Sequence, residues 1–378
     1  MTISLVEREN SVAEIDDIRK RIDALDEQIV RLLNDRAKAA LKIGDLKGKA
    51  NVYVPAREKE VYEHLEKVNS GPLSLYALKS VFREIMSATI ALQRKTSVAY
   101  FGKEGTFAHQ AALRKFGRSV DYIPSGGIED VFYAVEKGLA DYGVVPVENS
   151  TEGGVNRSLD MFMESSLRIC NEIYLQVHHH LMGARADIDL SKITKVYSHP
   201  QALAQCREFL GEELHQAEHI PVANTVEAAS RVREEHNSAV IGGEAAAEIY
   251  DLAIIRRNIE DNPRNVTRFL VIARESGPPS GHDKTSILAS IKDEVGALMR
   301  ILQIFDKAGI NLTRLESRPG WKRSWDYVFF IDFEGHAEDP KVKEVLKAVK
   351  TRCAYLDVLG SYPRAEALPL METKPASE

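Results

Sequence analysis

The feature that most constrains the fold is an N-terminal stretch whose pattern predicts one long helix. No proline occurs between residues 11 and 54. Apolar side chains recur there in three- and four-residue steps, a helical seam, at Ile15, Ile18, Ile22, Leu25, Ile29 and Leu32. A helix of roughly thirty residues or more is about 50 Å long, and the two shorter helices expected over 56–68 and 73–94 cannot cover it. We therefore expect a dimer in which the long helices pair.

Polar side chains occupy positions on these helices that should face inward. Arg36 continues the apolar seam of the first helix, and Lys47 shares its face. Thr89 and Gln93 extend the apolar face of the third helix. An unpaired buried charge is costly, so the two cations need an anionic partner. The pattern favours an interior that binds an anion, or else a dimer seam along which Lys and Arg extend to solvent.

From about residue 97 to 274 strands and helices alternate, which predicts a doubly wound α/β sheet or two such lobes. The expected strands are 98–101, 142–147, 195–197, 239–241 and 269–273. The expected helices are 106–116, 128–137, 200–210, 226–234 and 244–250. Open α/β sheets bind ligands at the carboxyl ends of their strands, so the residues that follow each strand are the candidates for a site.

Polar residues are concentrated where the valine-rich strand ends. Glu148, Asn149, Ser150 and Thr151 come directly after it, and two glycines precede the next helix. An ordinary strand-to-helix connection, the alternative, needs only one cap and one glycine. Similar polar junctions lie at 102–107, 197–203, 242–246 and 265–269. Helix capping explains any one of them, but so many in one region favour a ligand cleft.

A linker at 276–281, rich in glycine, proline and serine, precedes a C-terminal region. The order expected there is βαββαβ, the ferredoxin-like arrangement, with elements at 285–291, 295–308, 311–318, 327–333, 340–352 and 356–362. Such domains host many functions. The expected divisions of the chain are a helical domain over 1–95, an α/β domain over 96–275, a ferredoxin-like domain over 284–363 and a loose tail over 364–378.

Composition argues against several classes of protein. The net charge of −6 is mild and both signs are interspersed, unlike a nucleic-acid scaffold. We expect no secretory signal, and no apolar run reaches the ~18 residues that span a bilayer. The three cysteines lie far apart, as expected of reduced thiols in a cytoplasmic protein. The consecutive histidines at 178–180 would point to alternate faces of a strand, and no P-loop or dinucleotide fingerprint is present, so we expect neither a metal nor a cofactor.

The run 18–26, Arg36, Lys47, the turn at 55–58 and Gln93 stand at the spacing of the all-helical chorismate mutases, which this region resembles. The resemblance implies a domain-swapped dimer with active sites inside the bundle and Arg19 supplied by the partner chain. It implies chorismate binding by Arg19, Arg36, Lys47, Val54, Arg57, Glu58, Thr89 and Gln93, with a backbone contact near Val54. Arg19 and Arg36 would clamp the substrate's carboxylates. As catalytic residues, Lys47 and Gln93 would donate to the ether oxygen, and Glu58 would accept from the ring hydroxyl.

The triplet Thr267-Arg268-Phe269 is the specific part of a second resemblance, which runs along the whole α/β region, to prephenate dehydratase. It implies two lobes, like those of periplasmic binding proteins, with prephenate converted to phenylpyruvate in the cleft between them. Thr267 would be the catalytic donor to the leaving hydroxyl. The resemblance implies prephenate binding by Glu148, Asn149, Ser150, Thr151, His199, Thr267, Arg268 and Phe269. Arg268 could equally be a structural ion pair, and His199 is expected to form hydrogen bonds rather than act as the acid.

In the C-terminal region, Gly296-Ala297-Leu298 opens a helix and Glu316-Ser317-Arg318 ends the next strand. These motifs resemble the ACT domain of prephenate dehydratases, which binds phenylalanine between paired domains. The helix N-terminus would take the effector's carboxylate and Glu316 its ammonium. Feedback inhibition follows if the effector-bound dimer favours a closed or distorted cleft.

Together the resemblances identify a member of the bifunctional chorismate mutase–prephenate dehydratase family of phenylalanine biosynthesis. They imply a cytoplasmic homodimer or higher homo-oligomer that binds chorismate, prephenate and phenylalanine, with no nucleic-acid or membrane partner. One alternative is a mutase fused to prephenate dehydrogenase, which needs a nicotinamide-binding glycine fingerprint that the sequence lacks. The other is a non-catalytic amino-acid sensor with a two-lobed binding domain, against which the inward cations of the helical region argue.

Overall fold

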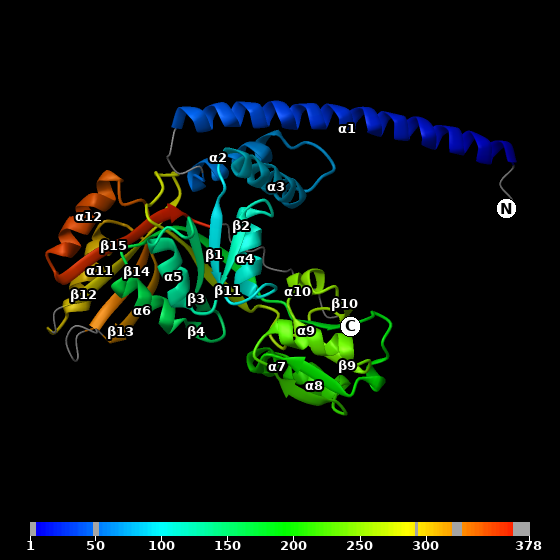
Figure 1. Cartoon of the computed structure of the whole chain (residues 1–378). Helices are drawn as coiled ribbons and strands as arrows, with labels where there is room; N and C mark the ends of the chain where they lie inside the picture. Colours follow the sequence, from blue (N-terminus) through cyan, green and yellow to red (C-terminus); the bar gives the residue numbers. More distant parts are fainter. Residues whose placement is uncertain (1–4, 48–52, 292–293, 320–326, 366–378) are drawn as a thin grey trace, which may run out of the picture.

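The computed structural model describes residues 5–47, 53–291, 294–319 and 327–365. A long helix and two shorter ones form the N-terminal region, followed by two α/β lobes and a C-terminal domain (Figure 1). The first α/β lobe is central: the helical region, the second lobe and the C-terminal domain all border it (Figure 1). None of the helices in this part of the chain combines the length and the apolar character that crossing a membrane requires.

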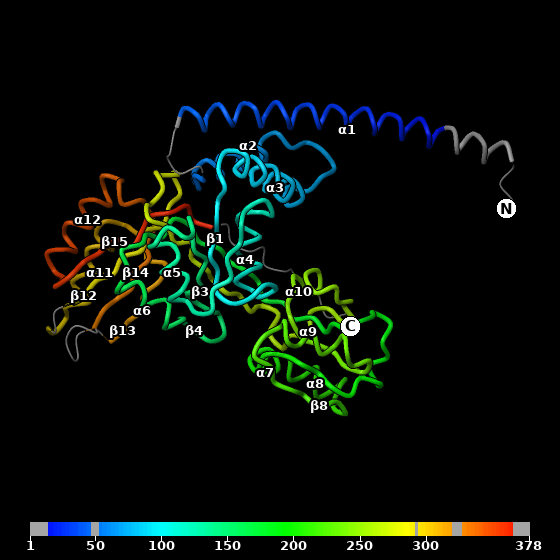
Figure 2. The backbone as a smooth tube through the Cα atoms, viewed as in Figure 1, coloured from blue at the N-terminus to red at the C-terminus, as the bar shows by residue number. Residues whose placement is uncertain are grey.

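The helical region consists of α1 (Leu5–Lys47), α2 (Pro55–Val68) and α3 (Leu75–Gln93). Pro55 begins α2, at a position where a backbone N–H would have no partner within the helix. Ser74 caps α3 by accepting a hydrogen bond from the Ala77 N–H. The predicted long helix is confirmed, and Figure 2 shows its N-terminal half running on past α2 and α3.

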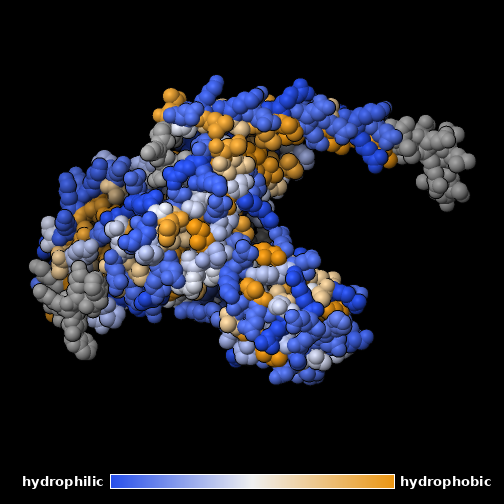
Figure 3. All heavy atoms as spheres, in the orientation of Figure 1, coloured by the Kyte–Doolittle hydropathy of each residue, from blue (hydrophilic) through white to orange (hydrophobic). Residues whose placement is uncertain are grey.

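The apolar seam of α1 is exposed to solvent from Ile15 to Leu32. Its exposed members are Ile15, Ile18, Ile22, Leu25, Ile29 and Leu32. Figure 3 shows hydrophobic side chains gathered beneath α1 and on the adjoining helices. Exposed apolar patches of this kind mark association surfaces, but pairing of α1 with a second chain stays a prediction.

The first lobe is built on a mixed sheet. Its strands run in the order β2 (Asp121–Ser125), β1 (Ser97–Phe101), β3 (Tyr142–Asn149), β11 (Val266–Ala273) and β5 (Arg168–Gln176), and β4 (Gly153–Gly154) pairs with β3. Its helices are α4 (Phe107–Phe116), α5 (Ile128–Glu136) and α6 (Asn156–Glu164). The strand β11 is antiparallel to both neighbours, so the sheet is not the parallel one that a doubly wound fold would have.

The second lobe confirms the two-lobe alternative. Its strands run in the order β10 (Ala253–Arg256), β6 (His180–Gly183), β9 (Ser238–Gly242), β7 (Lys195–Ser198) and β8 (Glu218–Pro221). Its helices are α7 (Pro200–Gln205), α8 (Arg207–Glu213), α9 (Thr225–Glu234) and α10 (Glu244–Ile249), with a short 3-10 turn at Leu190–Lys192. The one helix expected over 200–210 is two, because the backbone breaks at Cys206. Residues 177–179 and 257–265 connect the lobes.

The C-terminal domain has the predicted βαββαβ order. Its elements are β12 (Asp283–Ile291), α11 (Ala297–Lys307), β13 (Leu312–Pro319), β14 (Tyr327–Glu334), α12 (Pro340–Lys350) and β15 (Cys353–Pro363). Leu288, Phe330 and Leu359 share one apolar core with the first lobe. At Gly360 any side chain would overlap the Ile169 backbone, so this glycine lets β15 lie directly against β5. Most of the expected tail, 366–378, lies outside the described residues.

Candidate functional sites

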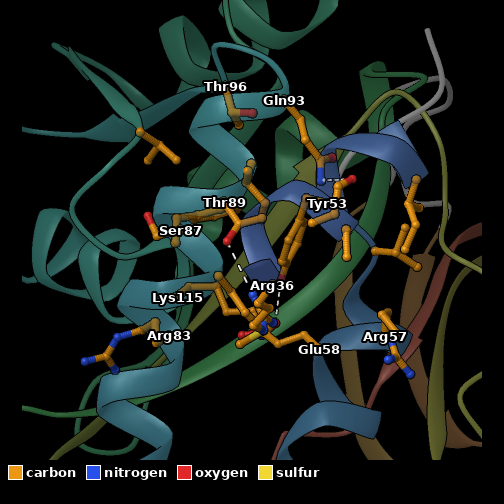
Figure 4. Close-up of a pocket in the computed structure, with 18 residues that line it drawn as sticks. Arg36, Tyr53, Arg57, Glu58, Arg83, Ser87, Thr89, Gln93, Thr96 and Lys115 are labelled. Carbon is orange, nitrogen blue, oxygen red and sulfur yellow. Dashed lines mark hydrogen bonds and ion pairs between the residues drawn. The ribbon is translucent and has the colours of Figure 1, made fainter. Parts of the chain in front are cut away.

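A cavity of about 300 Å³ lies beneath α1, between α2, α3 and the C-terminal end of α4 (Figure 4). We call it the α1 cavity. It brings together most of the site residues predicted for the helical region: Arg36, Val54, Arg57, Glu58, Thr89 and Gln93. Arg83 and Lys115 also line it, although the sequence pattern did not single them out.

Arg36 brings a positive charge to this cavity. Its Nη1 lies 3.3 Å from the Thr89 hydroxyl oxygen, and that hydroxyl donates in turn to the Ile85 carbonyl, 2.7 Å away. No carboxylate pairs with Arg36 among the residues that the structure describes. Partial burial lowers the pKa of Arg36 and the nearby Arg57 lowers it further, yet a guanidinium stays charged at neutral pH. The cavity therefore holds a half-buried cation that can accept an anionic ligand.

Gln93 joins α3 to α1 at the wall of the cavity. Its Nε2 donates to the Ala40 carbonyl over 2.9 Å. A side chain at Gly44 would bring its Cβ within 3.3 Å of the Gln93 chain, so a glycine there allows the close approach. The amide nitrogen has two hydrogens, and the second remains available to a ligand.

Glu58 is the single carboxylate among the described residues that line the cavity. Its Oε2 accepts from the Tyr53 hydroxyl over 2.8 Å and forms an ion pair with Lys115 Nζ, also 2.8 Å away. Its Oε1 accepts from the Tyr62 hydroxyl over 3.1 Å. Burial, together with the Glu58 charge, raises the pKa of Tyr53 well above its ordinary value, so the phenol keeps its proton and acts as a donor. Two hydrogen bonds and one ion pair thus fix the position of this carboxylate.

Three of the predicted mutase residues are placed differently from those described so far. Arg57 lines the cavity, but its Nη1 pairs with Glu60 over 2.6 Å and its side chain is largely exposed. Arg19 lies on the free half of α1 beside Asp16, 3.3 Å away, and is not part of the cavity wall in one chain. Lys47 is the last residue of α1, and its side chain lies outside the described part of the structure.

A second polar cluster lies where β3 ends and the antiparallel strand β11 begins, beside the second lobe. Asn149 Oδ1 accepts from the backbone N–H groups of Thr151 and Glu152, over 2.9 and 3.1 Å. These two bonds fix the amide orientation, so Nδ2 is the atom that donates to the Thr267 hydroxyl oxygen over 2.8 Å and to Asn265 over 2.9 Å. Because the Thr267 oxygen already accepts, its own hydrogen is free to donate to a ligand.

We call Asn149, Ser150, Asn265 and Thr267 the Thr267 cluster. Ser150 Oγ accepts from the Val266 N–H over 2.9 Å, which ties β3 to β11. Asn265 Nδ2 lies 3.3 Å from Gln205 Oε1, on the second lobe. The cluster therefore sits where the two lobes meet. Asn265 was not predicted as a site residue, and only the pairing of β11 with β3 brings it next to Asn149.

Residues of the second lobe border this cluster. Gln201, in α7, donates to Glu152 over 2.5 Å and so links the lobes. His199 is exposed and caps α7, its Nδ1 accepting from the Gln201 N–H over 3.3 Å. Thr151 is exposed beside Asn149. The bond from Gln201 to Glu152 therefore brings the start of α7, with His199, close to the loop that carries Thr151.

Arg268 and Glu148 do not join the cluster. In the β11–β3 register Thr267 pairs with Asn149 and Arg268 pairs with Glu148, and successive side chains of a strand point to opposite faces. Arg268 is buried, with its Nη1 2.6 Å from Asp332 and its Nε 2.9 Å from Glu172. It is therefore the structural ion pair that the sequence left open, which corrects its assignment as a prephenate ligand.

Two further predicted prephenate residues also lie outside the Thr267 cluster. Glu148 is oriented toward the C-terminal domain, where its Oε2 lies 3.3 Å from Arg314 Nε. Phe269 is buried in the core of the first lobe, packed with residues such as Val144 and Ile173. Glu148 points to the opposite face of the sheet from Thr267. Phe269 shares the face of Thr267 but is buried in the core two residues further along the strand, so neither side chain is part of the cluster.

The predicted effector residues lie on two elements of the C-terminal domain. Gly296 precedes α11 with a φ of 73°, a left-handed conformation that favours glycine, and Ala297 and Leu298 begin the helix. On the edge strand β13, Glu316 accepts from Arg314 Nη2 over 2.6 Å and Ser317 is exposed. Arg318 donates to Asp160 in α6 over 2.7 Å.

Family models match three successive parts of the chain: "Chorismate mutase type II" over residues 18–94, "Prephenate dehydratase" over 98–277 and "ACT domain" over 285–351. The bifunctional chorismate mutase/prephenate dehydratase of Aquifex aeolicus is 49% identical over 358 residues, which cover 93% of this chain and 98% of that protein. The chain belongs to this bifunctional family. The family member from Pseudomonas aeruginosa is 46% identical over 92% of this chain and 97% of its own length.

Solved structures agree with this assignment to the bifunctional family. Prephenate dehydratase from Arthrobacter aurescens, in complex with L-Phe, matches with a TM-score of 0.65 and 33% identity, covering 74% of this chain and 93% of that one. The helical region is thus a chorismate mutase domain, the two lobes a prephenate dehydratase domain, and the C-terminal domain an ACT domain. The enzyme converts chorismate to prephenate and prephenate to phenylpyruvate. These matches support neither the dehydrogenase fusion nor the amino-acid sensor.

Proposed function

We propose that the α1 cavity is the chorismate mutase site and that its residues act by folding a dianionic substrate. The rearrangement is unimolecular, so the enzyme has to hold the enolpyruvyl chain over the ring and stabilise charge on the ether oxygen. The unpaired guanidinium of Arg36, oriented by Thr89, binds a substrate carboxylate. The observation that carries the proposal is this half-buried cation, which has no carboxylate partner among the described residues.

The remaining contacts follow from the geometry of the cavity. The free N–H of Gln93 donates to the ether oxygen, together with Lys47. Glu58, fixed by two hydrogen bonds and an ion pair, accepts from the ring hydroxyl. Arg57 contributes a further positive charge near a carboxylate of chorismate, and the backbone beside Val54 borders the chorismate ring.

The mutase site is completed by a second chain. Arg19 is exposed, and it lies on the half of α1 whose apolar seam is uncovered in one chain. Pairing two α1 helices buries that seam and brings each Arg19 to the partner's cavity, which makes the enzyme a homodimer or a larger homo-oligomer. The free cysteines Cys170, Cys206 and Cys353 are consistent with a cytoplasmic enzyme.

The Thr267 cluster is the dehydratase site. The Thr267 hydroxyl donates a hydrogen bond to the ring hydroxyl of prephenate, which leaves as water with a proton supplied in the end by the solvent. The bond to the ring carboxylate breaks, carbon dioxide departs, and its electron pair completes the aromatic ring. Asn149 directs the Thr267 hydrogen, while Ser150, Thr151 and His199 supply further polar contacts.

Phenylalanine regulates the dehydratase through the ACT domain. The N-terminus of α11, at Gly296-Ala297-Leu298, takes the effector's carboxylate, and Glu316, with Ser317 and Arg318 beside it, takes the ammonium. The Glu316 carboxylate already lies against Gly154, in the segment that follows Asn149. An effector that changes the position of Glu316 therefore acts close to the Thr267 cluster.

A coupled assay tests the proposal as a whole. Chorismate is supplied without any cofactor, and prephenate and phenylpyruvate are measured over time as phenylalanine is raised. We expect phenylpyruvate to form and phenylalanine to slow its formation. Prephenate that accumulates without conversion, or a rate insensitive to phenylalanine, would refute the corresponding part.

A further inference from the structure

The helix α4 belongs to the dehydratase domain but reaches the α1 cavity. At its N-terminus the Phe107 ring lies 5.3 Å from the His179 ring, next to the segment that leads into the second lobe. At its C-terminus Lys115 and Phe116 line the α1 cavity. One wall of the α1 cavity therefore comes from the dehydratase domain and not from the mutase domain.

Lys115 forms an ion pair across this boundary. Its Nζ lies 2.8 Å from Glu58 Oε2, and the two side chains are 18% and 10% exposed. A pair so shielded from solvent interacts more strongly than an exposed one. The same nitrogen lies 5.9 Å from the centre of the Tyr53 ring, which packs against Phe116.

We propose that Lys115 is a positioning residue for the chorismate mutase reaction and acts through Glu58. Glu58 is a negative charge in a cavity that receives a dianion, which by itself repels the substrate. Lys115 offsets that charge and, with Tyr53, fixes Oε2. Each carboxylate oxygen accepts more than one hydrogen bond, so Glu58 keeps acceptor capacity for the ring hydroxyl. The inference rests on the proposed mutase site and adds a residue of the neighbouring domain to it.

The test compares full-length enzymes in both reactions. Lys115→Met should lower mutase kcat/KM about tenfold to a hundredfold, the worth of a hydrogen bond to a charged group. It should leave dehydration of added prephenate unchanged, which shows that the fold is intact. Lys115→Arg keeps the charge and should recover most of the mutase activity. Arg114→Met removes a cation from the adjacent, exposed position of α4 and should change neither reaction.

A double-mutant cycle decides whether Lys115 acts through Glu58. In a Glu58→Gln background, Lys115→Met should lower mutase kcat/KM much less than it does in the wild type, because the carboxylate that Lys115 positions is gone. Additive losses would overturn the proposal, as would a Lys115→Met enzyme with wild-type mutase kcat/KM. Wild-type enzyme that fails to rearrange chorismate would instead refute the mutase function itself.

Discussion

Asn149 Nδ2 donates to Thr267 Oγ1 across 2.8 Å, and this bond decides where the threonine hydrogen points. Replacing Asn149 by Asp removes the donor and leaves an acceptor. The Thr267 hydrogen should then turn to the new carboxylate and away from prephenate. We expect kcat for dehydration of prephenate to fall about a hundredfold, the usual worth of a positioned proton donor.

Steady-state kinetics with prephenate check this prediction, and the mutase activity of the same enzyme is the control. Thr267→Ser keeps the hydroxyl and should retain most of the dehydratase activity. An Asn149→Asp enzyme with unchanged kcat would show that the orientation of Thr267 has no bearing on the reaction.

Mixing two inactive enzymes tests whether Arg19 serves the partner's site. Arg19→Ala and Gln93→Ala should each lose mutase activity and keep prephenate turnover. In a heterodimer one site then carries both substitutions and the other carries neither. Random reassociation makes half the dimers mixed, so about a quarter of wild-type mutase activity should return.

Activity is measured after the two variants are unfolded and refolded together, with each variant refolded alone as the control. Mutase activity that does not rise on mixing would place Arg19 and Gln93 in the site of the same chain, and α1 would then not be exchanged.

Asp332 should make the contact between the dehydratase and ACT domains sensitive to acid. Burial alone raises the pKa of Asp332, but the Arg268 guanidinium and the Ser286 hydroxyl hold it below its ordinary value of 3.8. A lowered pKa means that the stabilisation is present above pH 3.8 and is lost as the pH falls through the folded-state value. Asp332→Asn should therefore destabilise the protein by about 3 kcal/mol at neutral pH.

Urea unfolding, followed by circular dichroism at several pH values, measures that difference. The difference in unfolding free energy between wild type and Asp332→Asn should become smaller below pH 3.8. A gap that stays constant down to the lowest pH would mean that the Arg268 pair contributes no stability through the charge of Asp332.

Glu316 should transmit the phenylalanine signal. Glu316→Gln removes the charge proposed to bind the effector's ammonium, so inhibition of the dehydratase should weaken at least tenfold in phenylalanine concentration. Basal dehydration of prephenate should be retained. Glu344→Gln, on an exposed position of α12, is the matched control. Unaltered inhibition in Glu316→Gln would remove Glu316 from the effector site.

Local patterns predicted those parts of the sites that lie on one regular element. Helical spacing placed Arg36, Thr89 and Gln93 on inward faces, and the structure brings all three to one cavity. Lys115 and Tyr53 could not be found this way. Lys115 belongs to a helix of another domain, and its contact with Glu58 depends on how the two domains pack.

The strands of the α/β region show a different limit of prediction from sequence. Alternation along a strand already implies that adjacent residues such as Thr267 and Arg268 face opposite sides, and the structure bears this out. The strand β5 was missed because Asn171 and Glu172 interrupt its apolar run. Both are buried, with Asn171 bonded to Tyr53 and Glu172 to Arg268 and Lys284, all distant in sequence. Buried polar residues of this kind become interpretable only once their partners are known.

The most direct test of the whole account supplies chorismate to a Thr267→Val enzyme and follows both products. Because the mutase and dehydratase sites use separate residues, we expect chorismate to be consumed at the wild-type rate and prephenate to accumulate. Phenylpyruvate formation should fall at least about a hundredfold. Phenylpyruvate appearing at the wild-type rate, or chorismate no longer being consumed, would contradict it.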